Sequence, residues 1–138
     1  MIELDIYIDG ASKGNPGPSG IGAVICRNGE TIKNLSVYIG ETTNNVAEYT
    51  ALIYALKAAI DLKAQAIKVN SDSQLLCRQL KKTYKVKSAN IIGLYHQATK
   101  MLSGFKHVVI NNIPREENSG ADKLATKAVK EQLKKQDL

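Results

Sequence analysis

The pattern of apolar and polar residues changes near Thr43, and this change limits the folds that the chain can adopt. Before Thr43, apolar and polar residues alternate as in a strand with one buried face. Asn28-Gly29 separates two such runs, 21–27 and 31–39, and is a strong signal for a tight hairpin. The first run has its apolar residues at Ile2, Leu4, Ile6 and Ile8. We therefore predict three strands that form an antiparallel meander.

Helix and strand patterns alternate in the rest of the chain. Residues 46–62 are almost all helix-forming and apolar, which indicates a long, buried central helix. We predict a strand at 66–71, helices at 72–82 and 88–103, a strand at 105–113 and then a C-terminal helix. Strand–helix–strand units require parallel pairing and right-handed crossovers. The predicted fold is therefore α/β, with helices on both faces of a mixed five-stranded sheet of three antiparallel and then two parallel strands.

Composition sets the frame for function. The 138 residues are enough for one domain, 1–138, with a real core. The net charge of +6 favours anionic partners, although a basic surface that contacts only solvent has the same net charge. Cys26 and Cys77 lack metal-ligand spacing, so we expect reduced thiols in a cytoplasmic protein. No apolar run reaches membrane-spanning length, and we expect neither a membrane partner nor an obligate protein partner, with a monomer as the default.

Four acidic residues stand among small polar residues where predicted strands end or helices begin: Asp9, Glu48, Asp72 and Asp122. Each has a structural explanation when taken singly. A turn explains Asp9, and a capping box that begins at Asn45 explains Glu48. The helix dipole favours Asp72 and Asp122 in first turns.

Taken together, the acids point to metal binding. Strand parity places Asp9 and Asp72 on one face of the sheet, at the ends of neighbouring parallel strands. The helices that carry Glu48 and Asp122 begin at the same edge. Carboxylates that lie close together repel one another, and bound divalent cations relieve the repulsion. We therefore predict a metal site for attack on a phosphodiester.

Four segments carry motifs in a fixed order: YIDGASKGNPG at 7–17, TTNNVAE at 42–48, SDSQ at 71–74 and NSGADKLA at 118–125. Their order and spacing resemble the signature motifs of the type 1 ribonuclease H (ribonuclease HI) family across nearly the whole chain. The resemblance implies a ribonuclease H-like fold. It also implies an endoribonuclease that hydrolyses the RNA strand of an RNA–DNA hybrid.

The resemblance also implies roles for the four acids. Asp9, Glu48, Asp72 and Asp122 match the family's catalytic metal ligands, with Asp9 bridging two Mg²⁺ ions. Mn²⁺ is an alternative ion, because it too accepts carboxylate oxygens. One ion would orient a water and the other would steady the departing 3′-oxygen, leaving 5′-phosphate and 3′-hydroxyl ends.

Further positions match residues that contact the hybrid. By position, Asn15, Asn45 and Gln74 match residues near the minor groove, where a side-chain amide can both donate and accept. Thr43 and the backbone amide of Asn44 match a pocket for a phosphate of the DNA strand. Ordinary helix capping also explains Thr43, and one hydroxyl can serve both purposes.

The chain departs from the family pattern in two places. The basic protrusion of many relatives shrinks to 81–87, which has four lysines and no Trp, and which a solvated loop explains equally well. The loop before Asp122 lacks the mobile His of bacterial relatives. Arg115 or Glu116 could replace that His, Glu117 could tune the second metal from the outer shell, and Asn118 is a further auxiliary candidate. The Pro-Arg-Glu-x-Asn form resembles one branch of the family.

Three rival interpretations remain. The first is a catalytically silent hybrid-binding module, which we expect to have lost one or more of the acids. The second is another nuclease, a transposase or a resolvase on the same fold, without the Gly-Asn-Pro-Gly loop. The third is a detached reverse transcriptase domain, against which the start at Met1 favours a free-standing enzyme.

Overall fold

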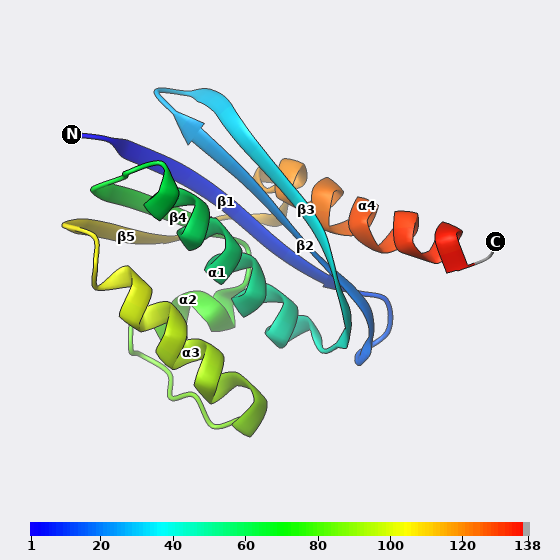
Figure 1. The fold of residues 1–138 in the computed structure, drawn as a ribbon. Helices are drawn as coiled ribbons and strands as arrows, with labels where there is room; N and C mark the ends of the chain where they lie inside the picture. The colour runs from blue at the N-terminus through cyan, green and yellow to red at the C-terminus, as the bar shows by residue number, and fades with distance from the viewer. Residues whose placement is uncertain (137–138) are drawn as a thin grey trace.

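The computed structural model describes residues 1–136, and its centre is one mixed sheet (Figure 1). The strand order is β3-β2-β1-β4-β5. β1 pairs antiparallel with β2 and parallel with β4, while β3 and β5 form the two edges. The predicted sheet is therefore confirmed. The strands are β1 Glu3–Ser12, β2 Gly17–Arg27, β3 Glu30–Thr42, β4 Ala66–Ser71 and β5 His107–Asn112.

Helices cover both faces of the sheet, as predicted. α1 packs against β1 and β2 on one face, with α3 against α1. α4 packs against β1, β2 and β3 on the other face (Figure 1). The helices are α1 Asn44–Asp61, α2 Gln74–Leu80, α3 Ala89–Leu102 and α4 Ser119–Gln136, with a 3₁₀ turn, η1, at Arg115–Glu117. Within residues 1–136, none of the helices combines the length and apolarity needed to cross a bilayer.

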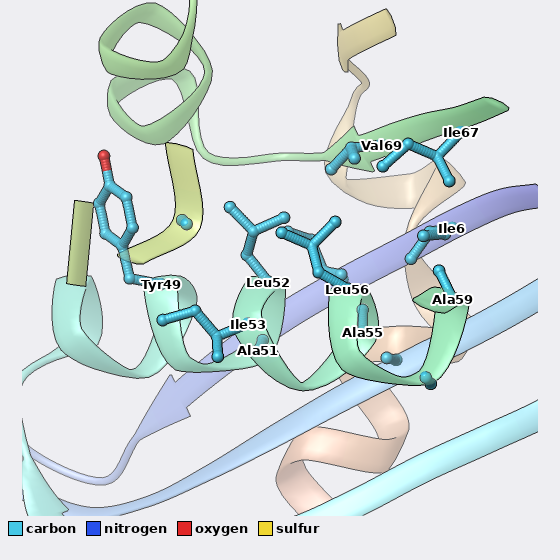
Figure 2. Packing of buried hydrophobic residues seen from close by; sticks show 14 of the residues in the cluster. Ile6, Tyr49, Ala51, Leu52, Ile53, Ala55, Leu56, Ala59, Ile67 and Val69 are labelled. Atoms are coloured by element: carbon cyan, nitrogen blue, oxygen red, sulfur yellow. The ribbon is translucent and has the colours of Figure 1, made fainter. Parts of the chain in front are cut away.

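The core lies between α1 and the centre of the sheet. Leu52 and Leu56 of α1 point toward Val69 and Ile67 of β4, and both leucines are fully buried (Figure 2). Burial of a leucine side chain stabilises a fold by roughly 1.5–3 kcal/mol. This packing fixes the position of α1 on the sheet, and with it the position of Glu48.

The strands next to the Gly/Pro-rich segment are longer than predicted. β1 continues past Asp9 to Ser12, and β2 already begins at Gly17. The Ser12 hydroxyl donates to the Thr42 carbonyl oxygen at 2.9 Å. Side-chain bonding of this kind extends the strands into a segment whose composition alone predicts a loop.

The start of α2 also differs from the prediction. The helix begins at Gln74, because Ser73 is its N-cap and accepts a hydrogen bond from the Leu76 backbone N–H at 3.2 Å. The predicted start of this helix at residue 72 is therefore wrong. Asp72 precedes the helix and does not lie in its first turn.

Candidate active site

The four acids line one pocket. This pocket has a volume of about 280 Å³, and Arg115, Asn44 and Ser12 also line it. Its acidic members are Asp9, Glu48, Asp72 and Asp122. The four residues predicted as metal ligands therefore lie together in the structure, although they are far apart in the sequence.

The sheet places two of these acids side by side. The parallel pairing of β1 with β4 ends where Ile8 faces Ser71. Asp9 and Asp72 are the next residues along the two chains. Neighbouring strands lie about 4.8 Å apart, so the two carboxylates emerge next to each other at one edge.

Two glycines allow the helices that carry the other acids to come close. A Cβ at Gly10 would lie 2.4 Å from the backbone nitrogen of Glu48, at the start of α1. Gly22 faces Asp9 across the ladder, and a Cβ there would lie 2.1 Å from the carbonyl oxygen of Ala121. Any larger residue would hold Glu48 and Asp122 away from Asp9. Neither close contact follows from a local sequence pattern, because each joins segments far apart in the chain.

The structural explanation of Glu48 as a capping residue fails. Thr43 is the N-cap of α1, and its hydroxyl accepts from the Val46 backbone N–H at 3.3 Å. Oε2 of Glu48 is buried and has no hydrogen-bond partner among the described residues. A buried carboxylate oxygen without a partner is costly unless a cation or a proton satisfies it.

Burial and repulsion between the carboxylates raise the pKa values of two of the acids, Asp9 and Glu48. Burial, followed by the charge of Asp72 and then by Asp122 and Glu48, raises the pKa of Asp9 to about 8. Burial likewise raises the pKa of Glu48 to about 7, and the charge of Asp72 contributes, while the Ser73 side chain acts in the opposite direction. Near neutral pH the site therefore favours protons or a bound cation over a full set of bare carboxylates.

The residues present fit divalent ions of the magnesium type. In the described part of the chain, no group of three or more His, Cys, Asp or Glu side chains is arranged to hold a metal ion. Mg²⁺ does not require one, since it is usually held by one or two carboxylates together with water and substrate phosphates. A bound cation would satisfy the unpartnered Glu48 oxygen and would offset the burial and repulsion that raise the pKa values of Asp9 and Glu48.

Asn118 supports the site from behind. Its side chain is 1% exposed, and its Nδ2 donates to the Ile8 carbonyl oxygen at 2.9 Å and to Oδ2 of Asp72 at 3.0 Å. Of the other auxiliary candidates, Arg115 lines the pocket, whereas Glu116 and Glu117 are exposed on η1 and do not.

The predicted substrate-binding residues surround the start of α1 and α2. The Asn44 backbone N–H, expected to hold a phosphate, donates to Oδ1 of Asn15 at 3.0 Å. A phosphate can reach this N–H only after the Asn15 side chain moves. Asn45 and Gln74 are exposed, and Thr43 is half-buried as the cap of α1.

Comparison with known proteins gives consistent matches. The family model described as reverse transcriptase-like matches residues 7–128. A protein of Mycobacterium tuberculosis described as bifunctional is 40% identical over 130 residues, which are 93% of this chain but 36% of that protein. The chain therefore spans little more than a third of that relative. A ribonuclease H of Agrobacterium fabrum is 36% identical over 141 residues, covering 94% of this chain and 96% of that protein.

Solved structures agree with these matches. The crystal structure of RNase H1 from the archaeon Halobacterium salinarum has a TM-score of 0.91 at 38% identity and covers 94% of this chain and 98% of that one. An RNase H1 isolated from compost, crystallised with an RNA/DNA hybrid, has a TM-score of 0.88 at 39% identity, over 94% and 99% of the two chains. With its fold, its four acids and these relatives, the chain belongs to the type 1 ribonuclease H family.

Proposed function

We propose that this protein is a metal-dependent endoribonuclease that hydrolyses the RNA strand of RNA–DNA hybrids. The observation that carries the proposal is the pocket in which Asp9, with a pKa raised to about 8, meets the three other acids. Relatives named ribonuclease H, and the hybrid bound by the compost RNase H1, support the choice of substrate.

The four acids would hold two divalent ions, Mg²⁺ or alternatively Mn²⁺. When bound, such a pair supplies an activated water and neutralises charge on the leaving 3′-oxygen, so that the products carry 5′-phosphate and 3′-hydroxyl ends. Asp9 would be the central metal ligand, because Asp72, Asp122 and Glu48 all raise the pKa of its carboxyl group. Asn118 fixes the orientation of Asp72 through its 3.0 Å hydrogen bond.

Arg115 supplies positive charge at the same pocket. A guanidinium can make two parallel hydrogen bonds to a phosphate, so we assign Arg115 to the RNA phosphate next to the cleaved bond. Glu116 and Glu117, exposed on η1, are assigned no contact with that phosphate.

Selection of the hybrid would rest on the amide side chains around the pocket. RNA is distinguished from DNA by its 2′-hydroxyl, which both donates and accepts hydrogen bonds. Asn15, Asn45 and Gln74 can do the same in return. Thr43 and the Asn44 amide, at the start of α1, would take a DNA phosphate once Asn15 has released that amide.

A substrate panel tests the proposal. An RNA–DNA hybrid, single-stranded RNA, duplex RNA and duplex DNA, each end-labelled, are incubated with Mg²⁺, with Mn²⁺ and with a chelator. We expect metal-dependent cutting of the RNA strand of the hybrid, with 5′-phosphate ends. Binding of the hybrid without cutting under either metal would leave the alternative, a catalytically silent hybrid-binding module.

A further inference from the structure

The outer face of α4 carries a row of lysines. The helix buries Ala121, Ala125, Ala128 and Val129. Residues three and four positions apart lie on the same side of a helix. On the side opposite the buried one, this spacing aligns four exposed residues, Lys123, Lys127, Lys130 and Lys134.

Little negative charge offsets this row. Its one ion pair among the described residues joins Nζ of Lys127 to Oε1 of Glu131 at 3.8 Å. The two side chains are 61% and 60% exposed, so water screens the pair and its net contribution to stability is small. Within residues 1–136, no carboxylate pairs with Lys123, Lys130 or Lys134. The face therefore keeps most of its positive charge.

The row begins at the candidate active site. A shallow depression of about 370 Å³ is lined by Asp122 and continues along α4 as far as Lys134. The helix rises about 1.5 Å per residue, so the row from Lys123 to Lys134 is about 16 Å long. A strand of duplex nucleic acid places one phosphate about every 3.4 Å along its axis, so the row spans about five phosphates.

We propose that Lys123, Lys127, Lys130 and Lys134 form a track for the phosphate backbone of a nucleic-acid substrate that extends beyond the cleavage site. This inference rests on the proposed function and adds a second binding surface to it. None of the four lysines lines the acid pocket, and Asp122 is the one residue that lines both this pocket and the depression along α4. The track therefore acts on affinity and on the preferred substrate length, and it leaves the chemical step unchanged.

The test compares two triple variants with equal net charge. Lys127→Gln/Lys130→Gln/Lys134→Gln removes the outer part of the track. Lys33→Gln/Lys63→Gln/Lys106→Gln removes three exposed lysines elsewhere. Each lowers the net charge from +6 to +3, since three positive charges are lost. Both are measured against a short hybrid confined to the active site and a long hybrid extended on both sides, over a series of salt concentrations.

For the long hybrid, we expect the track variant to bind about tenfold more weakly than the wild type at low salt. We also expect the slope of the logarithm of its binding constant against the logarithm of the salt concentration to decrease in magnitude by up to about 2.7, which is about 0.9 for each lost phosphate contact. The control variant keeps both values, and the short hybrid binds all three proteins alike. Equal slopes for the track and control variants would overturn the inference. Absence of cleavage by the wild type would instead count against the proposed function, because binding and its salt slope are measured separately.

Discussion

Asn118 and Asp72, which are 46 residues apart in the sequence, are joined by a 3.0 Å hydrogen bond from Nδ2 of Asn118 to Oδ2 of Asp72. The same amide also donates to the Ile8 carbonyl oxygen, next to Asp9. One buried side chain thus ties the start of α4 to β1 and to the acid at the end of β4. Hydrogen bonds that orient metal-binding side chains commonly affect both metal affinity and rate.

We therefore expect Asn118→Ala to lower kcat or metal affinity by about 10- to 100-fold. It should also lower the free energy of unfolding by about 1–3 kcal/mol, because the Ile8 carbonyl loses its donor. Asn111→Ala is the matched control, since Nδ2 of Asn111 donates at 3.0 Å to Oδ1 of Asn70 and not to any of the four acids. Steady-state kinetics over a range of Mg²⁺ concentrations measures the difference. Equal losses of activity in the two variants would contradict a positioning role for Asn118.

The second prediction concerns the close contact between β2 and α4. Gly22→Ala places a Cβ 2.1 Å from the carbonyl oxygen of Ala121, so α4 must shift. We expect a destabilisation of about 1–3 kcal/mol and a loss of activity, because Asp122 shifts with the helix. Gly93→Ala is the control, since a Cβ at Gly93 in α3 meets nothing within 4 Å. It should raise stability by up to about 1 kcal/mol through helix propensity. Thermal unfolding distinguishes the two, and a neutral Gly22→Ala would contradict the packing argument.

The third prediction concerns pH and metal. Asp9 and Glu48 have folded-state pKa values raised to about 8 and about 7, above their ordinary values of roughly 4. Between about pH 4 and pH 8 the folded protein therefore binds more protons than the unfolded chain. The stability that comes from protonated Asp9 and Glu48 is complete below about pH 4 and is lost as the pH rises toward about 8. In a chelator, Asp9→Asn should thus stabilise the protein at pH 8 by at least about 1 kcal/mol, and much less at pH 5.

Thermal midpoints at the two pH values test this, with Asp61→Asn as a control at an exposed acid. Mg²⁺ should raise the midpoint of the wild type at pH 8, because it neutralises the same carboxylates. The account fails if Asp9→Asn shifts the midpoint equally at pH 5 and pH 8.

The fourth prediction separates the capping of α1 from phosphate binding. Thr43→Ala removes the acceptor for the Val46 N–H and should cost about 1 kcal/mol of stability. Thr43→Ser keeps that acceptor and should retain both stability and hybrid affinity. If Thr43 also binds a DNA phosphate, Thr43→Ala weakens binding of the hybrid at a temperature where the variant is fully folded. Unchanged affinity there would leave Thr43 with capping alone.

The strand order and the gathering of the acids could be predicted from the sequence because both follow from local patterns combined with the general rules of strand connection. Period-two alternation around Ile6 defined β1, and Asn28-Gly29 defined the β2–β3 hairpin. Parallel pairing of β4 with β1 then placed Asp72 beside Asp9. The first two steps depend on residues close together in the chain, and the third follows from the parallel pairing that strand–helix–strand units require.

Other features depend on contacts that local patterns do not encode. The start of α2 was misplaced because Ser71 and Ser73 are both residues of a type that caps helices, and the cap in the structure is Ser73. The role of Gly22 becomes visible only when α4 lies against β2. The bond from the Asn44 N–H to Asn15 likewise joins residues 29 positions apart.

The fifth prediction addresses the central claim, that the acid pocket hydrolyses RNA in a hybrid with the help of bound metal. Cleavage of an end-labelled RNA–DNA hybrid is followed in Mg²⁺ for the wild type, Asp9→Asn and the control Asp61→Asn. We expect the wild type and Asp61→Asn to cut the RNA strand at similar rates, and Asp9→Asn to bind the hybrid without cutting it. Cutting by Asp9→Asn at the wild-type rate, or undiminished cutting by the wild type in a chelator, would contradict the account.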